Sequence, residues 1–220
     1  AGVFVMEAMW TRFLPMMTEI FKVIDSGQVG QVRFSVADHS LYLPEHLVPR
    51  LWSPEAGGGA LLDLGIYPIS LFSRLFGKES AVTARGVKTA AGLDLTTSAI
   101  FEYSDGAQAV MTTSMETSGS VNASIIGTKG RIEIERMFYE QTTFSVHEND
   151  LSAAPGTPTQ VATYEAKIEG RGMQYQALEV ERCIHAGLTE SPILTLDETV
   201  SIMETMDEIR SQTGVKYPGE

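Results

Sequence analysis

The sequence predicts an α+β fold in which an open, mainly antiparallel sheet packs on helices. Between residues 81 and 165, β-branched and polar residues alternate in short runs, the period of two that is typical of strands. Glycine-containing turns such as 104–106 and 127–130 join these runs, and turns of this kind connect antiparallel neighbours. Residues with helical spacing lie before and after this region. The strands are therefore expected to form a meander and not a series of βαβ units.

The expected elements follow from local spacing, in chain order. Apolar residues recur every three or four positions in four segments, which predicts helices at 14–24, 59–76, 173–186 and 196–213. Alternating segments predict strands at 32–42, 82–88, 95–103, 107–113, 121–126, 131–135, 143–147 and 160–164. The proline-rich stretch 43–58 is expected to be an irregular loop, and 151–159 an exposed hairpin loop.

The amino-terminal segment differs in character from the rest of the chain. Residues 3–9 form a short apolar run, which predicts a buried strand of a parallel sheet. No second strand of this kind is evident in the sequence. The segment is therefore expected to belong to a sheet that the remaining residues do not supply.

Composition narrows the classes of function. With 16 Lys and Arg against 28 Asp and Glu the formal charge is −12, so contact with nucleic acid or an anionic membrane is not expected. The single cysteine, Cys183, excludes an internal disulfide, fits a cytoplasmic protein, and has apolar helical neighbours that predict a buried thiol. The four histidines lack ligand spacing, so no metal site is expected. Glu179, Glu181 and Glu190 are expected on a solvated helix surface.

The most unusual segment of the chain runs from Gly57 to Pro68. Asp63 and Tyr67 stand four residues apart, so a helix places them on one face. Gly65 and Pro68 disfavour a helix interior by about 1 and about 3 kcal/mol relative to Ala, so a kink that shapes a site is expected. Spacing alone leaves two interpretations open. In one, Asp63 is a capping or solvated acid and Tyr67 a core aromatic; in the other, both belong to a site.

Four short motifs occur along the chain at compatible spacings. They are Met6-Glu7-Ala8-Met9-Trp10-Thr11-Arg12-Phe13-Leu14-Pro15, the segment Gly58 to Pro68, Gly127-Thr128-Lys129-Gly130, and Gly172-Met173 through Glu190-Ser191-Pro192. Together they resemble the glucose-fructose oxidoreductase/inositol dehydrogenase (Gfo/Idh/MocA) family. The resemblance spans nearly the whole chain in the family's order.

The resemblance implies a two-domain enzyme with this chain as its carboxyl-terminal part. Residues 1–13 would be the last strand and exit of a dinucleotide-binding domain that is otherwise missing. Residues 14–220 would be the substrate-binding and dimerisation domain, with a fold like the carboxyl-terminal domain of glyceraldehyde-3-phosphate dehydrogenase. NADP or NAD would bind mainly to the absent domain, and a homodimer would form through the open sheet.

By position in the motif, Tyr67 resembles the family's catalytic acid/base and Asp63 its partner. A secondary hydroxyl must lose a proton as it becomes a carbonyl, and a phenol can take that proton. The ordinary pKa of Tyr, about 10, is too high for an efficient base at neutral pH, so a nearby cation must lower it. In the family this cation is the lysine of a Glu-Lys-Pro motif, which this sequence lacks. The chain alone is therefore expected to be inactive.

Five further residues are candidates for binding. Trp10 and Arg12 match the family's Trp-x-Arg element, which implies a position near the cofactor; core packing of Trp10 and a surface charge for Arg12 are the alternatives. Arg33, His39 and Trp52 are candidate substrate-binding residues. For Arg33 and His39 the alternative is a solvated face, and for Trp52, which would stack on a sugar, it is a packed loop.

The resemblance therefore predicts part of an NAD(P)-dependent oxidoreductase that acts on a diol, aldose or other polyhydroxy compound. One alternative is a non-catalytic binding or dimerisation module with the same fold. The other is an NAD-dependent glycosidase of the same family. The presence of Asp63 and Tyr67 in their motif favours an enzyme over a non-catalytic module.

Overall fold

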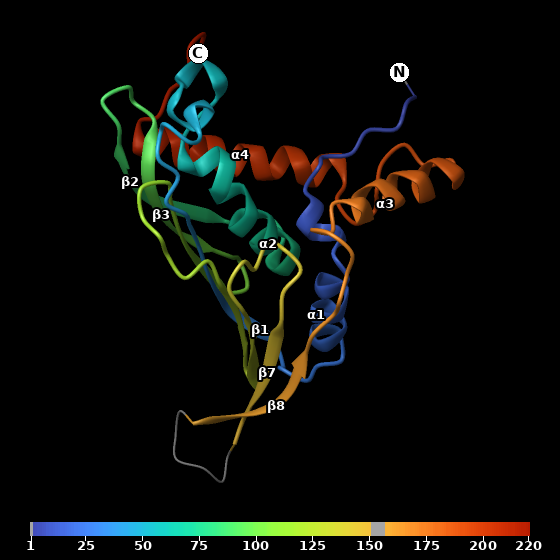
Figure 1. The fold of residues 1–220 in the computed structure, drawn as a ribbon. Coiled ribbons are helices and arrows are strands. Elements are labelled where there is room, and N and C mark those ends of the chain that lie inside the picture. The colour runs from blue at the N-terminus through green and yellow to red at the C-terminus, as the bar shows by residue number, and fades with distance from the viewer. Residues whose placement is uncertain (1, 151–156) are drawn as a thin grey trace. The chain divides into compact units, whose positions relative to one another are not determined.

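The computed structural model describes residues 2–150 and 157–220 (Figure 1). Its helices are α1 (Pro15–Asp25), α2 (Ile66–Phe76), α3 (Gln174–His185) and α4 (Leu196–Thr213), with short helical turns at Trp10–Phe13, Pro49–Trp52, Pro54–Ala56 and Leu61–Gly65. Its strands are β1 (Val32–Ser40), β2 (Ala81–Lys88), β3 (Asp94–Glu102), β4 (Gln108–Ser114), β5 (Ala123–Gly127), β6 (Gly130–Ile134), β7 (Phe144–Asn149) and β8 (Pro158–Tyr164). The predicted α+β class is confirmed.

The described strands belong to a mixed sheet of eight strands, and the chain divides into two compact units. The first unit comprises residues 1–33 and 124–201, and the second comprises 34–123 and 202–220. Strand order is β5-β6-β7-β8 within the first unit and β2-β3-β4-β1 within the second. The sequence gives no sign of this division, because each unit is assembled from segments that are far apart in the chain.

Strand pairing is mainly antiparallel, as predicted. The antiparallel pairs are β2 with β3, β3 with β4, β6 with β7, and β7 with β8. In contrast, β1 and β4 pair in parallel, with Phe34 opposite Gln108 and Ser40 opposite Ser114. A parallel pair requires a long crossover connection. The residues between β1 and β4 provide it with a loop, α2 and the β2–β3 hairpin.

Three predicted elements either differ from those in the structure or lie outside the described residues. The strand predicted at 3–9 is not formed, since residues 2–9 have no regular secondary structure. A strand is held by a neighbouring strand, whereas here the Val5 N–H donates to the Thr189 carbonyl at 3.0 Å. The predicted hairpin loop at 151–159 falls largely on residues 151–156, which lie outside the described residues. The predicted helix at 59–76 is divided into a turn and a helix, as described below.

Helix α2 is the core helix of the second unit. By length and composition alone, the described stretch Pro54–Phe76 is apolar enough to cross a membrane, but 56% of its most apolar window is buried inside the protein. Phe72 of α2 meets Phe101 of β3 edge to face, with ring centroids 5.4 Å apart. The apolar residues of α2 thus pack on the sheet.

A side chain from α4 covers the outer edge of β2. Strand β2 is the last strand of its sheet, so backbone groups on its outer side need other partners. Gln212 accepts from the Ala84 N–H at 2.7 Å and donates to the Val82 carbonyl at 2.8 Å. The amide side chain therefore reproduces the hydrogen bonds of a neighbouring strand and blocks the edge against another chain.

Replacing Gln212 by Ala is expected to lower the free energy of unfolding by about 1 to 2 kcal/mol, because two part-buried backbone groups lose their partner. The opened edge is also expected to increase self-association. Urea unfolding and light scattering measure the two effects. Ser211→Ala, at an exposed neighbouring position of α4, is the control and should change neither quantity. Equal behaviour of the two variants would contradict this role for Gln212.

In the first unit, a buried carboxylate ties α3 to the segment before α4. Glu179 is 7% exposed and accepts from Arg182 Nε at 2.7 Å, Ser191 Oγ at 2.6 Å and Cys183 Sγ at 3.2 Å. These donors, the Arg182 guanidinium above all, lower the pKa of Glu179 to about 2. The prediction of a buried Cys183 is confirmed. The prediction of a solvated Glu179 is wrong, because the side chain turns inward to three donors.

Acid is expected to weaken the Glu179 cluster. An unfolded Glu titrates near pH ~4.3 and the folded group near 2, so the stabilisation is present above about pH 5 and is lost as the pH falls toward 2. The cluster stabilises the folded state by on the order of 2 kcal/mol. This is less than the full pKa shift of Glu179 would correspond to, because the half-exposed Arg182 is screened by solvent. Glu179→Gln should therefore unfold in less urea than the wild type at pH 7 but in nearly the same urea at pH 2. A difference that does not change with pH would contradict the assignment.

Candidate active site

The segment that contains Asp63 and Tyr67 folds as a π-turn that leads into an α-helix. Leu61–Gly65 form one π-helical turn, and α2 begins at Ile66. Glycine at residue 65 lets the Leu61 side chain pack closely on the turn, because a Cβ there would lie 2.9 Å from Leu61 Cδ1. Single π-turns are rare in proteins overall, and those that occur often lie at functional sites. The predicted kink thus takes the form of a widened turn.

Asp94, at the start of β3, holds the beginning of this turn. Its side chain is buried, and its Oδ2 accepts the Leu61 N–H at 2.6 Å. The carboxylate can approach because residue 59 is glycine with φ +104°, where a Cβ would lie 2.3 Å from Asp94 Oδ1. Burial raises the pKa of Asp94. Sequence reasoning missed this residue, although an isolated acid between Leu93 and Leu95 was a signal for it.

His39 of β1 lies behind the turn. It is 1% exposed, so the expectation of a solvated face is wrong; this face of β1 is covered within the second unit. Its Nδ1 lies 2.9 Å from the Leu64 carbonyl, and the Thr113 hydroxyl donates to the His39 carbonyl at 3.0 Å. Burial, partly opposed by the hydrogen bond to Leu64, lowers the pKa of His39 to about 4. The imidazole is therefore neutral at neutral pH.

Tyr67 and Asp63 lie at the partly open side of this segment. Tyr67 is half-buried on α2 and meets the His39 ring edge to face, with centroids 5.1 Å apart and planes at 76°. Asp63 lies in the π-turn with its side chain 30% exposed, and it forms an ion pair with Arg50. Arg50 belongs to the proline-rich loop at 43–58, and sequence reasoning did not identify it as the partner of Asp63.

This arrangement combines a phenol with a carboxylate one turn before it. A phenol can exchange a proton with a bound hydroxyl group, and a carboxylate accepts hydrogen bonds from neighbouring hydroxyls. The second unit therefore brings together His39, Asp63 and Tyr67 of the predicted site residues.

The other substrate candidates are placed differently. Trp52 is half-buried in the proline-rich loop, where its Nε1 donates to the Leu43 carbonyl at 2.9 Å. Its ring packs against the cluster that contains Leu51 and Leu64, as the packed-loop alternative predicted. Stacking of Trp52 on a substrate stays a prediction. Arg33 is exposed on β1 and belongs to the first unit.

Trp10 and Arg12 are both buried in the first unit. Trp10 is 5% exposed, meets Tyr139 edge to face at 6.2 Å, and has the Arg171 guanidinium 5.7 Å from its ring centre. Arg12 is 6% exposed and donates to Glu198 and to the Ile193 carbonyl. The alternative of a surface charge is thus wrong for Arg12. A contact of either residue with a cofactor stays a prediction.

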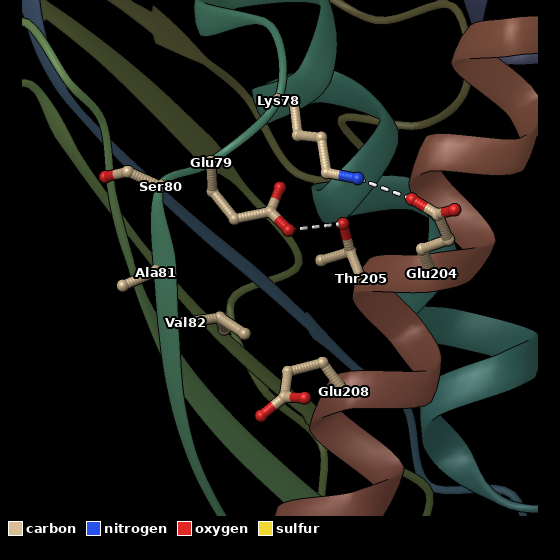
Figure 2. Close-up of a pocket in the computed structure, with 8 residues that line it drawn as sticks. All are labelled: Lys78, Glu79, Ser80, Ala81, Val82, Glu204, Thr205 and Glu208. Atoms are coloured by element: carbon tan, nitrogen blue, oxygen red, sulfur yellow. Dashed lines mark hydrogen bonds and ion pairs between the residues drawn. The ribbon is translucent and has the colours of Figure 1, made fainter.

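A cavity of about 420 Å³ lies beyond the far end of α2 (Figure 2). The residues that line it are Lys78, Glu79, Ser80, Ala81, Val82, Glu204, Thr205 and Glu208. Lys78 pairs with Glu204, and the Thr205 hydroxyl donates to Glu79 at 2.7 Å (Figure 2). Because α2 separates Lys78 from Tyr67, at a rise of about 1.5 Å per residue, the cavity is roughly 15 Å from Tyr67 along the helix. It contains none of the predicted site residues.

The chain is similar to several dehydrogenases. It is 36% identical over 219 residues to trans-1,2-dihydrobenzene-1,2-diol dehydrogenase of Xenopus laevis, covering 99% of this chain and 65% of that protein. The enzyme of the same name from Sus scrofa is 33% identical over 220 residues, with 99% and 64% covered. The chain thus spans less than two thirds of the length of these relatives.

Solved structures share the fold at lower identity. One is aldose-aldose oxidoreductase of Caulobacter crescentus complexed with glycerol, with a TM-score of 0.75, 22% identity, and 93% of this chain and 60% of that chain covered. Another is KijD10, a 3-ketoreductase of Actinomadura kijaniata in complex with NADP and TDP-benzene, with a TM-score of 0.77, 21% identity, and 96% and 63% covered. Residues 17–133 match the family model described as GFO/IDH/MocA C-terminal domain, and the chain therefore belongs to that family.

Proposed function

We propose that this chain is the substrate-binding and catalytic-residue domain of an NAD(P)-dependent oxidoreductase that acts on a diol, aldose or other polyhydroxy compound. The observation that carries the proposal is Tyr67, a half-buried phenol in ring contact with the buried His39, with Asp63 one turn away. Relatives named as dehydrogenases of a diol, and as oxidoreductases of aldoses, support the substrate class.

The proposed chemistry divides an alcohol oxidation into a proton and a hydride. A nicotinamide, when bound, supplies the acceptor for the hydride. Tyr67 Oη would take the hydroxyl proton during oxidation and return it during reduction. Asp63 would accept hydrogen bonds from neighbouring hydroxyl groups and so orient the substrate or Tyr67. None of the six lysines of the sequence lies in a Glu-Lys-Pro motif, so the cation that assists Tyr67 would come from outside this chain.

The described residues by themselves do not fit a dinucleotide. The polar atoms of Arg12 are directed to Glu198 and to a backbone carbonyl, and Trp10 packs against Tyr139. The sequence also lacks a Gly-x-Gly-x-x-Gly loop after a strand. We therefore propose that NADP or NAD binds mainly to a separate dinucleotide-binding part of the protein. The structure of KijD10 in complex with NADP supports this cofactor class.

Replacing Tyr67 by Phe removes the proposed acid/base and keeps the ring beside His39. In the complete enzyme with NADP, turnover is expected to fall 10²- to 10⁴-fold, while KM changes little. The melting temperature and circular dichroism of the variant should match those of the wild type. Steady-state kinetics over a panel of diols, aldoses and glycosides measures the effect.

The same experiment separates the alternative functions. A non-catalytic module would give no turnover in the wild type on any substrate of the panel. Hydrolysis of glycosides, with no net change of NAD, would indicate the glycosidase. Wild-type turnover that survives in Tyr67→Phe would contradict the role proposed for Tyr67.

A second copy of this chain is the proposed partner of the open sheet face in the second unit. Val36 of β1, Val110 of β4 and Ile100 of β3 lie opposite one another in the registers of these strands. Val36 is 38% exposed and Ile100 is 45% exposed. An apolar row across three strands can meet its own copy about a two-fold axis. The proposal that the family-type dimer forms here rests on this row.

Ile100→Lys is expected to convert a dimer into a monomer, because it places a charge within the proposed apolar contact. Size-exclusion chromatography with light scattering, over a range of concentrations, measures the change. Val161→Lys, at an equally exposed valine of β8, is the control and should leave the dimer intact. A wild-type protein that is monomeric at all concentrations would rule the contact out.

A further inference from the structure

Pro68 removes one donor that the Leu64 carbonyl would have in a regular α-helix. In an α-helix the N–H of residue 68 would donate to the carbonyl of residue 64, but proline has no N–H. Gly65 and Ile66 have helical dihedral angles, φ −64° with ψ −25° and φ −56° with ψ −32°, so the geometry for that bond is present. At the end of the π-turn a backbone N–H donates to the buried Leu64 carbonyl, and the second lone pair of this oxygen can accept from one further donor.

His39 supplies that donor. Its Nδ1 lies 2.9 Å from the Leu64 carbonyl oxygen, and because a carbonyl can only accept, Nδ1 carries the proton. Burial keeps the ring neutral at neutral pH, with its pKa lowered to about 4. The hydrogen bond therefore selects one tautomer and one orientation of the imidazole.

The same ring contacts Tyr67, three residues after Leu64. The two rings meet edge to face with centroids 5.1 Å apart, a geometry that favours one relative orientation. The main chain of His39 is itself held, since the Thr113 hydroxyl donates to its carbonyl at 3.0 Å. One rigid side chain of β1 thus fixes the π-turn at Leu64 and the phenol at Tyr67 together.

We propose that His39 is a positioning residue for Tyr67, which acts through its hydrogen bond to the Leu64 carbonyl and its ring contact with the phenol. This inference rests on the proposed function, because it requires Tyr67 to be the acid/base. With an exposure of 1%, His39 is placed to orient the phenol and not to contact the substrate. Pro68 is the second part of this arrangement, because it removes a backbone N–H that would compete with His39 for the second lone pair of the Leu64 carbonyl.

Two substitutions of His39 separate the hydrogen bond from simple packing. Asn can place its amide N–H near the position of Nδ1 and keep the hydrogen bond, whereas Leu has a comparable volume and no donor. In the complete enzyme with NADP, we expect His39→Leu to lower kcat at least 10-fold with KM changed less than 3-fold. We expect His39→Asn to retain at least three times the kcat of His39→Leu. Equal losses in the two variants would overturn the proposal.

A second-site change tests the role of Pro68. In the His39→Leu background, Pro68→Ala restores an N–H that can donate to the Leu64 carbonyl. The double variant is expected to recover several-fold in kcat over His39→Leu alone. No recovery would mean that the hydrogen bond to Leu64 is not what positions Tyr67, and would overturn the proposal.

Two controls separate positioning from other roles. Phe101→Leu leaves a cavity between β3 and α2 in the same unit and should lower the melting temperature with little change in kcat. A loss of kcat in His39→Leu no larger than in Phe101→Leu, at equal loss of melting temperature, would show a merely structural role. The pH profile of kcat/KM in His39→Leu should keep both limbs of the wild type; loss of a limb would make His39 itself the titrating group.

Full activity of Tyr67→Phe would overturn the proposed function, whereas an inactive Tyr67→Phe with a normal His39→Leu would overturn this inference alone.

Discussion

The second unit depends on one constraint, the need to pair the backbone groups where a buried helix begins. The π-turn starts inside the protein, so its N–H and carbonyl groups cannot turn to water. Asp94 of β3 takes the Leu61 N–H, and His39 of β1 donates to the Leu64 carbonyl. Thr113 of β4 supports His39 from the neighbouring strand. Three strands thus fix the turn through polar contacts, and Tyr67 is placed as a result.

These contacts divide the polar residues of the unit into two groups. Burial raises the pKa of Asp94 and lowers that of His39, so in each residue it disfavours the charged form, and both serve mainly as fixed hydrogen-bonding groups. Asp63 and Tyr67 are in contrast half-buried and reach the partly open side of the segment. Rigid buried groups therefore support groups that remain accessible, as a site for a small polar molecule requires.

Local pattern was sufficient for much of the fold, and for part of the site. The bounds of α4 and most strands follow from spacing, because a helix or strand period is a property of neighbouring residues. The parallel pairing of β1 with β4 and the two compact units depend on which distant segments meet, so spacing could not predict them. Asp63 and Tyr67 were predicted as site residues from their motif, and their roles stay a prediction. The positions of His39 and Asp94 became evident only from the arrangement of the strands. The backbone groups with which these side chains form hydrogen bonds belong to a turn that is distant from them in the sequence.

The ion pair of Asp63 with Arg50 adds a connection between the turn and the proline-rich loop. The loop is anchored by Trp52, whose indole donates to the Leu43 carbonyl and whose ring packs on a buried cluster that includes Leu64. Arg50 itself is 59% exposed, and an exposed pair of this kind contributes only about 0 to 1 kcal/mol. In the proposed site, Asp63 would therefore exchange Arg50 for a substrate hydroxyl or another cation at small cost, whereas the buried Asp94 cannot release the Leu61 N–H without leaving it unpaired. The difference in burial between these two carboxylates thus makes one of them suitable for ligand contact and keeps the other structural.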